Sequence, residues 1–386
     1  TLMRTVALIV GTRPEVIKMA PVYFALRDSA QLRPVLVATA QHRQMLDQAL
    51  GAFGLKADHD LDLMRAGQTL PELTGRVVTA VCGWLDHHHP DVVLVQGDTT
   101  TVLGSALAAF YSGIPVGHVE AGLRTGSLRT PFPEEMNRRV TSTLTRWHFC
   151  PTEGARANLL REGVEPAHCH VTGNTVVDAL LGARERARLA PAELPAFAAR
   201  LGIPEAFAAR HFVPGGAPWA LMTGHRRESF GEGFERICHA IRRLAEEHPD
   251  LGVVYPVHLN PQVQEPVRRL LQDHPRVVLI PPTDYLDFIR LLDRATFVLT
   301  DSGGVQEEAP TLGKPVLVLR DSTERPEGVA AGTCVLVGTD PARIVAEAAR
   351  LLRDPAEYAR RAALRNPYGD GQSAGRIRAI LEREPL

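Results

Sequence analysis

The sequence predicts an α/β protein built from two doubly wound, Rossmann-like domains that face a cleft. A length of 386 residues favours two domains over one. Short β-branched runs alternate with longer amphipathic stretches in two successive series, which is typical of parallel sheets covered by helices on both faces. Between the two series, residues 185–218 are rich in Ala, Arg, Leu and Pro, which indicates connecting helices and a linker.

The first series gives the elements of the first domain. Near-continuous apolar runs predict strands at 5–10, 35–39, 92–96, 116–119 and 147–150. Helical patterns lie between them at 14–27, 70–88, 100–111 and 134–145.

The second series predicts strands at 219–223, 252–256, 277–280, 297–300, 316–319 and 334–337. Helices are expected between them, for example at 234–248 and 341–353. The last stretch, 373–384, also has a helical pattern and is expected to return to the first domain. We therefore expect a first domain of residues 1–180 completed by 366–386, and a second domain of residues 181–365.

Composition and charge narrow the function. The chain has 43 Lys plus Arg against 44 Asp plus Glu, so it lacks the cationic surplus that nucleic-acid binding requires. No apolar run approaches the length of a membrane span, and no signal peptide is visible. Five scattered cysteines without a C-x-x-C pair indicate buried thiols in a reducing compartment. We expect a cytoplasmic protein.

A glycine-rich turn follows the predicted strand 297–300. Ser302, Gly303 and Gly304 stand at the start of a helix, where unpaired N–H groups and the helix dipole suit a phosphate. The alternative is that Asp301 and Ser302 only cap the helix and the glycines only make the turn. The chain has neither a P-loop nor a G-x-G-x-x-G motif.

Cationic residues follow other strands. His225 and Arg226 come directly after the strand 219–223, and Arg325 follows the strand 316–319. In the first domain, Arg13 and Lys18 lie at the start of the first helix and can face the same cleft. Singly each is explained as a solvated surface residue, but together they suit a diphosphate.

Carboxylates collect at the strand ends of the first domain. Asp98 follows the strand 92–96, Glu120 follows 116–119, and Glu134 opens a helix beside Glu135. Asp98 can be an N-cap and Glu134 a favourable first-turn acid. Glu120 has no such structural role, because an acid between an apolar strand and an Ala-Gly turn is costly unless it is paired or used. Acids at one sheet edge suit general acid–base chemistry.

Three adjacent histidines, His87, His88 and His89, do not indicate a metal site. Adjacent helical side chains point in different directions, whereas helical ligand pairs need a spacing such as i, i+4. At a helix end they are more simply surface residues. We therefore expect no metal.

Phosphate-binding residues in one domain and acids in the other suit a nucleotide-sugar. A dozen ordered motifs then resemble the bacterial non-hydrolysing UDP-N-acetylglucosamine 2-epimerases. The motifs are GTRPEVIKMAP, QHRQMLDQ, QGDTTT, GHVEAGLRTG, PFPEEMNRR, GNTVVDAL, TGHRRESFG, PVHLNP, TDSGGVQEEAP, GKPVLVLRD, TERPEGV and NPYGDG. The resemblance implies a glycosyltransferase-B type fold and a homodimer that needs no cofactor. It also implies a role in cell-surface polysaccharide biosynthesis.

The implied reaction is reversible conversion of UDP-GlcNAc to UDP-ManNAc. UDP is eliminated to give 2-acetamidoglucal and is then added back, with protonation on the other face of C2. By matching motif, Asp98, Glu120 and Glu134 form the acid–base group, without individual assignment because the roles exchange with direction. Open alternatives are a glycosyltransferase, a hydrolysing epimerase that releases ManNAc, and a nucleotide-sugar sensor.

The resemblance also implies the binding residues. For UDP they are Arg13, Lys18, His225, Phe288, Ser302, Gly303, Gly304, Glu308 and Arg325. Phe288 would flank the uracil and Glu308 would accept the ribose hydroxyls. Thr283 departs from the pattern, since many relatives have Gln there. For a second, activating UDP-GlcNAc the implied residues are Gln41, His42 and Gln44.

Overall fold

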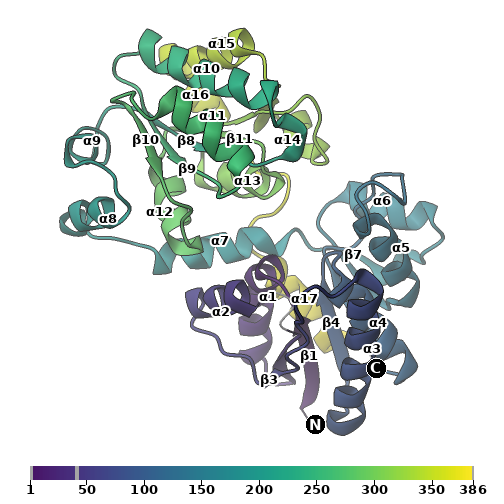
Figure 1. Ribbon diagram of the computed structural model, residues 1–386. Helices are drawn as coiled ribbons and strands as arrows, with labels where there is room; N and C mark the ends of the chain where they lie inside the picture. The colour runs from purple at the N-terminus through teal and green to yellow at the C-terminus, as the bar shows by residue number, and fades with distance from the viewer. Residues whose placement is uncertain (1–2, 40–42, 385–386) are drawn as a thin grey trace. The chain divides into compact units, whose positions relative to one another are not determined.

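The computed structural model describes residues 3–39 and 43–384. The chain divides into two compact units. Unit 1 consists of Thr1–Gly182 with Tyr368–Leu386, and unit 2 of Ala183–Pro367. Each is described below by itself (Figure 1).

Unit 1 is built on a seven-stranded sheet in the order β3-β2-β1-β4-β5-β6-β7, with every paired neighbour parallel. Its strands are β1 (Arg4–Val10), β2 (Leu32–Ala38), β3 (His59–Asp60), β4 (Val92–Gln96), β5 (Val116–Val119), β6 (Trp147–Cys150) and β7 (Cys169–Val171). The central strands are mostly apolar because helices cover both faces, with Gln96 of β4 and His118 of β5 as polar exceptions. The order reverses between β1 and β4, and ligands of such sheets bind beyond the carboxyl ends of the strands at this point.

The helices of unit 1 form two layers. Its helices are α1 (Arg13–Arg27), α2 (Arg43–Ala52), α3 (Leu70–His88), α4 (Thr100–Tyr111), α5 (Glu134–Leu144), α6 (Glu153–Arg161), the start of α7 (Thr175–Arg186) and α17 (Ser373–Arg383). Residues of α1, α2 and α17 share one core cluster with the sheet, and α3 and α4 share another. The C-terminal helix α17 packs beside α1 (Figure 1).

Local signals set where these helices begin. Pro14 lies in the first turn of α1, where its missing N–H costs nothing. At α3, Thr69 and Glu72 form a capping box: the Glu72 carboxylate accepts the Thr69 N–H at 2.7 Å, and the Thr69 hydroxyl accepts the Glu72 N–H at 3.4 Å.

Unit 2 repeats the topology of unit 1 with six parallel strands in the order β10-β9-β8-β11-β12-β13. The strands are β8 (Trp219–Thr223), β9 (Gly252–Pro256), β10 (Val277–Ile280), β11 (Phe297–Thr300), β12 (Val316–Val318) and β13 (Cys334–Leu336). Here the order reverses between β8 and β11.

The helices of unit 2 also form two layers. One core cluster joins α10 (Glu232–Glu247), α11 (Pro261–Leu271) and α15 (Pro341–Arg353) to the sheet. The other joins α8 (Leu194–Arg200), α9 (Glu205–His211) and α12 (Tyr285–Arg294). The remaining helices are α13 (Gly303–Glu308), α14 (Pro326–Ala331) and α16 (Pro355–Ala362).

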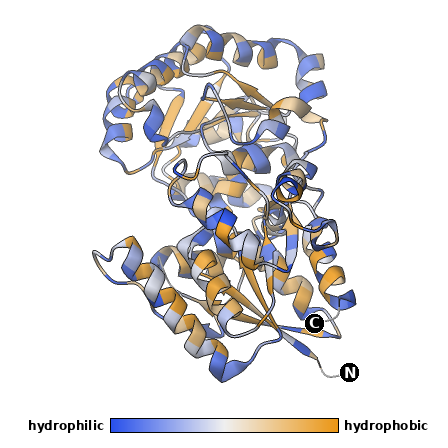
Figure 2. Cartoon of the chain, turned by 90° about the vertical axis from the view of Figure 1, so that its right-hand side faces the viewer, coloured by the Kyte–Doolittle hydropathy of each residue, from blue (hydrophilic) through white to orange (hydrophobic). Residues whose placement is uncertain are grey.

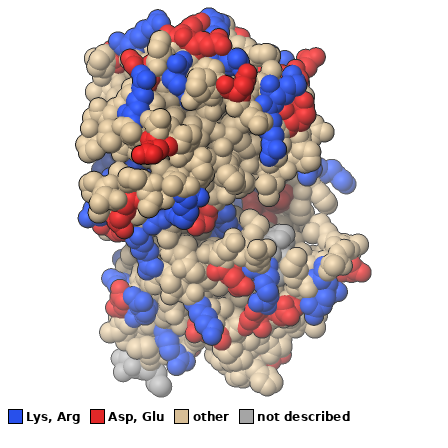
Figure 3. All heavy atoms as spheres, turned by 60° about the vertical axis from the view of Figure 1, so that its left-hand side comes forward, with Lys and Arg blue, Asp and Glu red and all other residues tan. Residues whose placement is uncertain are grey.

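The distribution of polarity follows this layering. The strands are mostly hydrophobic, whereas the outer helices alternate between polar and apolar positions (Figure 2). On the face drawn in Figure 3, cationic and anionic side chains are interspersed, in keeping with the near-equal charge totals. No helix among the described residues is long and apolar enough to cross a membrane.

Most predicted elements are confirmed to within two residues, and the α/β fold class is confirmed. The prediction lacked β3 and β7, which are edge strands of two and three residues. Neither is long enough to show a periodic pattern, so only pairing with a neighbouring strand defines them.

Candidate active site

Asp98 lies two residues beyond β4, at the edge of unit 1 where the strand order reverses. Its Oδ2 accepts hydrogen bonds from Arg138, at 2.7 Å from Nη2 and 3.1 Å from Nε. The neighbouring Asn137 donates its side-chain N–H to the Asp98 carbonyl at 2.8 Å. Helix α5 thus fixes both the carboxylate and the backbone of Asp98.

Glu120 follows β5 directly and is the most constrained of the acids. Its φ of +66° is left-handed, a conformation that costs a residue with a side chain about 1 kcal/mol or more. Its Oε2 lies 2.5 Å from Nζ of Lys18 and accepts a hydrogen bond of 2.8 Å from Gln96. Helix α1 and two strand ends therefore meet here, because Lys18 lies in the second turn of α1, Gln96 ends β4 and Glu120 follows β5.

Glu134 and Glu135 are adjacent but have different surroundings. Glu134 is half-buried at the first position of α5. Glu135 is fully buried and accepts the backbone N–H groups of Thr125 at 3.1 Å and Gly126 at 3.3 Å. Burial would raise the pKa of Glu135, but these amides and Arg138 outweigh it and hold the pKa below its ordinary value. Glu135 is a structural anchor, and Glu134 remains the candidate for chemistry.

Sequence reasoning missed Glu15, which is 2% exposed. Its Oε2 accepts the backbone N–H groups of Gly11 at 2.6 Å and Thr12 at 2.8 Å, and its other oxygen accepts the Thr99 hydroxyl. Burial raises the pKa of Glu15 to about 7. The spacing Thr12-x-x-Glu15 was a visible capping-box signal. The contact to Thr99 joins the loops after β1 and β4 across the point where the order reverses.

His118, on β5, contacts the loop after β4 that carries Asp98. It is fully buried, and its Nε2 lies 2.7 Å from the Gly97 carbonyl, directly before Asp98. Burial lowers the pKa of His118 to about 4, so the ring is neutral at physiological pH.

In unit 2, Asp301 follows β11 and is fully buried. Its Oδ2 accepts the backbone N–H groups of His225 and Arg226, each at 2.8 Å. Ser302 occupies the N-cap position of α13 but makes no side-chain capping bond. The explanation of Asp301 and Ser302 as simple helix caps is therefore wrong, because Asp301 instead holds the loop that follows β8.

Arg325 lies against the glycine turn. A Cβ added to Gly303 would stand 3.0 Å from the Arg325 guanidinium carbon, so glycine permits this close approach. Arg325 pairs with Glu307 at 2.9 Å and with Glu324 at 3.0 Å. Glu324 also pairs with Arg226 at 3.0 Å, which connects the cations predicted from two separate loops.

The remaining predicted binding residues are placed as follows. Arg13 is the half-buried first residue of α1. Glu308 ends α13, with one carboxylate oxygen 3.8 Å from the Cβ position of Gly304. Thr283 stands just before α12, and Phe288, within α12, packs partly against the core. Gln44 is exposed on α2, whereas Gln41 and His42 lie outside the described residues.

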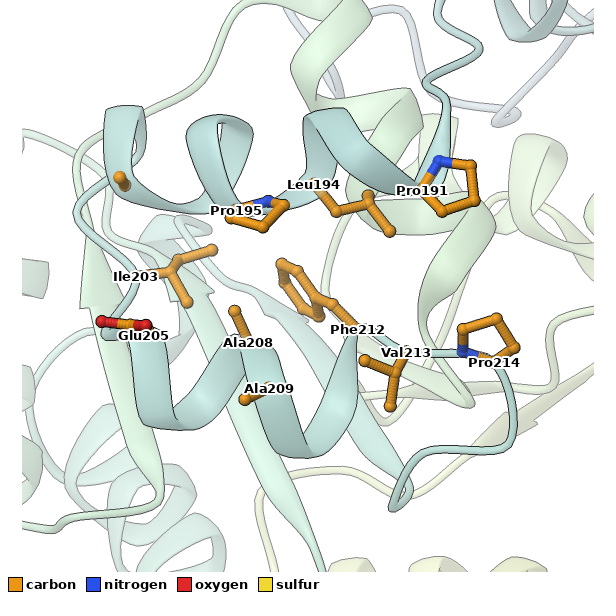
Figure 4. Close-up of a pocket in the computed structure, with 11 residues that line it drawn as sticks. Pro191, Leu194, Pro195, Ile203, Glu205, Ala208, Ala209, Phe212, Val213 and Pro214 are labelled. Carbon is orange, nitrogen blue, oxygen red and sulfur yellow. The ribbon is translucent and has the colours of Figure 1, made fainter.

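Other features carry less chemistry. An apolar hollow of about 420 Å³ between α8 and α9 has one charged lining residue, Glu205, and does not suit an anionic ligand (Figure 4). Within residues 3–39 and 43–384, no group of three His, Cys, Asp or Glu side chains could hold a metal. His88 stacks on Trp84 at 4.4 Å, and the five cysteines, all described, are unpaired thiols.

Comparison with known proteins gives consistent matches. A sequence profile described as UDP-N-acetylglucosamine 2-epimerase matches residues 24–382. The UDP-N-acetylglucosamine 2-epimerase of Escherichia coli strain K12 is 52% identical over 376 residues, covering 97% of this chain and 98% of that one. The crystal structure of the Neisseria meningitidis UDP-GlcNAc 2-epimerase bound to UDP-GlcNAc has a TM-score of 0.86 at 45% identity, covering 99% of this chain and 100% of the other.

A more distant structure agrees. The Methanocaldococcus jannaschii UDP-GlcNAc 2-epimerase, in complex with UDP-GlcNAc and UDP, has a TM-score of 0.78 at 33% identity, covering 98% of this chain and 100% of that one. The fold and the two sets of strand-end residues define an α/β enzyme of the glycosyltransferase-B type. Within that class, the chain belongs to the UDP-N-acetylglucosamine 2-epimerase family, whose members are isomerases.

Proposed function

We propose that this protein interconverts UDP-GlcNAc and UDP-ManNAc by elimination and re-addition of UDP, without hydrolysis. The observation that carries the proposal is Glu120, a non-glycine residue kept in a left-handed conformation between Lys18 and Gln96. Strained backbone of this kind collects at functional sites. The neighbouring Asp98 and Glu134 supply further carboxylates on the same unit.

The proposed chemistry needs no cofactor. One carboxylate removes the C2 proton while the bond between C1 and the UDP oxygen breaks, and UDP leaves with the electron pair. The product pair is 2-acetamidoglucal and UDP. In the second half, a carboxylic acid protonates C2 from the opposite face as a UDP oxygen attacks C1. Asp98, Glu120 and Glu134 share these roles, which exchange with the direction of reaction.

Unit 2 is proposed to bind the UDP part. The N–H groups of the turn at Ser302, Gly303 and Gly304 would donate to the diphosphate, with His225 and Arg325 as cationic partners. Arg13 and Lys18 of unit 1 would add positive charge. Glu308 is proposed to accept the ribose hydroxyls, and Phe288 and Thr283 to border the uracil.

NMR of UDP-GlcNAc incubated with the enzyme in deuterated water tests the proposal. We expect deuterium at C2 of an intact UDP-sugar, because the proton lost to a carboxylate exchanges with solvent. Release of free ManNAc would identify a hydrolase instead. Epimerisation with the original hydrogen retained at C2 would contradict proton exchange.

We further propose that the protein is a cytoplasmic homodimer that supplies cell-surface polysaccharide synthesis, and that a second UDP-GlcNAc activates it through Gln41, His42 and Gln44. Initial rates should then be sigmoidal in UDP-GlcNAc alone. Hyperbolic rates, with no activation of the reverse reaction by UDP-GlcNAc, would contradict activation. Sedimentation of the purified protein tests the dimer.

A further inference from the structure

Unit 2 contains a buried carboxylate oxygen whose surroundings call for an explanation. Oδ2 of Asp301 accepts two backbone N–H groups, but Oδ1 is buried and makes no hydrogen bond with any described residue. Buried acceptors are nearly always paired, so this unpaired oxygen at a strand end calls for an explanation. A candidate donor, Nδ1 of His225, lies 3.4 Å from it.

The loop that carries His225 is fixed from both sides. The Gly224 carbonyl accepts the Tyr255 hydroxyl of β9 at 3.3 Å, and the N–H groups of residues 225 and 226 bind Asp301 after β11. The hydroxyls of Thr223 and Thr300 meet at 2.6 Å and join β8 to β11 directly below. The backbone of His225 therefore has a set position relative to Asp301.

The imidazole of His225 is held as well, yet it stays partly accessible. Its ring stacks on that of His258, with centroids 5.6 Å apart and planes 23° from parallel. His258 is itself oriented, because its Nδ1 accepts the Asn260 N–H at 3.2 Å. The side chain of His225 remains 44% exposed. The Nδ1 edge of the ring thus faces Asp301, while part of the imidazole stays accessible.

We propose that Asp301 is a positioning residue for His225: it accepts the Nδ1–H and presents Nε2 to a phosphate oxygen of a bound nucleoside diphosphate. This inference rests on the proposed function of unit 2 as the UDP-binding unit. A carboxylate behind an imidazole selects the tautomer and stabilises the imidazolium. A proton taken from solvent at Nε2 then gives a charge-assisted hydrogen bond to the phosphate.

The charged and titratable groups that face His225 come from three loops. They are Asp301 after β11, His258 after β9, and Arg226 on its own loop, which Glu324 partly neutralises. Partial burial lowers the pKa of His225, Asp301 opposes that shift, and His258 and Arg226 add to it. Loss of the Asp301 charge should therefore lower the pKa further.

Asp301→Asn isolates this role. The asparagine oxygen can still accept both backbone N–H groups, so the loop is kept, but its NH2 would face Nδ1 and force the other tautomer. We expect the His225 pKa to fall below its wild-type value, because the imidazolium loses a carboxylate that faces Nδ1 at 3.4 Å. UDP affinity should fall about tenfold at pH 6, the effect of losing a hydrogen bond to a charged group, and should lose the part of its pH dependence that comes from His225. Asp340→Asn is the matched control, because Asp340 caps α15 and asparagine caps equally well.

The measurements are NMR titration of ¹⁵N-histidine-labelled full-length protein, assigned with His225→Asn, and calorimetry of UDP between pH 5.5 and 8.5. An unchanged His225 pKa in folded Asp301→Asn would overturn the proposal. If that variant does not fold, the wild-type spectrum decides: a neutral His225 protonated at Nε2 rather than Nδ1 contradicts the role. Absence of UDP binding by the wild type would instead refute the proposed function, and the histidine titration would still test Asp301.

Discussion

The sheet edges of the two units have the same topology but different chemistry. In each, the strand order reverses between the first strand and the fourth, and a buried carboxylate accepts two backbone N–H groups at that point. Glu15 does this in unit 1 and Asp301 in unit 2. In both units the carboxylate fixes the loop after the first strand, so this shared contact stabilises the fold and is independent of which ligand binds.

What differs is the group offered to a ligand. Unit 1 presents side chains, namely carboxylates oriented by Lys18, Gln96 and Arg138. Unit 2 presents a glycine turn, approached by Arg325 so closely that a Cβ at Gly303 would crowd it. Under the proposed function, one fold would carry proton transfer in one unit and anion binding in the other, according to the residues that follow equivalent strands.

The largest expected effect is a loss of turnover without a loss of UDP affinity, which would separate proton transfer from anion binding. Asp98→Asn should lower turnover by about 10³-fold or more, because it removes a carboxylate of the proposed acid–base group. UDP affinity should stay nearly unchanged, since Asn can still accept the Arg138 hydrogen bonds. Steady-state kinetics and calorimetry with UDP measure both quantities, with Asp86→Asn, exposed on α3, as the control. Equal loss of turnover and UDP affinity would contradict the division of labour.

The next effect tests the buried carboxylate of unit 1. Burial raises the pKa of Glu15 from 4.5 to about 7, so its stabilising contribution is fully present below pH 4.5 and is lost as pH rises through 7. The free energy of unfolding should therefore lose about 3 kcal/mol over this pH range. In urea unfolding, the free energy of unfolding of Glu15→Gln should therefore rise relative to that of the wild type by about 3 kcal/mol between pH 4.5 and 8. Parallel stability curves would contradict a protonated Glu15.

His118 should make the free energy of unfolding change with pH in the opposite direction to Glu15. Burial lowers its pKa from 6.5 to about 4, so its stabilising contribution is fully present above pH 6.5 and is lost as pH falls through 4. By pH 5 the loss is about 2 kcal/mol. His118→Gln should be less sensitive to acid than wild type in the same urea experiments. An equal acid sensitivity would show that His118 protonates without cost.

Lys18 can serve either of the two proposed roles, proton transfer through Glu120 or binding of UDP. The resemblance assigns it to UDP, but its Nζ lies 2.5 Å from Glu120. If its main work is to hold Glu120, Lys18→Met should lower turnover about 30-fold, the value of a hydrogen bond to a charged group. UDP affinity should then change less than about threefold. A loss of UDP affinity equal to the loss of turnover would return Lys18 to the binding set; Lys56→Met, at an exposed lysine of unit 1, is the control.

The smallest effect concerns the glycine turn. Gly303→Ala would place a Cβ 3.0 Å from Arg325 and should weaken UDP binding about tenfold by displacing the guanidinium. Gly304→Ala meets its nearest atoms at 3.8 Å, an ordinary contact, and should weaken binding less. Calorimetry with UDP ranks the two variants. The reverse ranking would mean that Gly304 approaches the ligand more closely than Gly303.

Much of the fold and part of the site followed from local pattern. The buried strands Val92–Gln96 and Phe297–Thr300 were predicted to the residue, because continuous apolar runs have no other stable place than a covered sheet. Polar residues directly after such strands marked Asp98, Glu120 and Ser302 as candidates. The partners of these residues did not follow, since Arg138 meets Asp98 from 40 positions away.

The sequence by itself determined the fold class, the family and the strand-end residues that can do chemistry, because periodicity and motif order are local properties of the chain. Only the tertiary structure decided which of them act on one another. It excluded the alternative that Asp301 is only a helix cap, since Asp301 accepts the backbone N–H groups of the loop at His225, and it gave Glu120 its contacts to Lys18 and Gln96. The reason is physical: hydrogen bonds and ion pairs across a parallel sheet depend on strand order, which local sequence patterns do not encode.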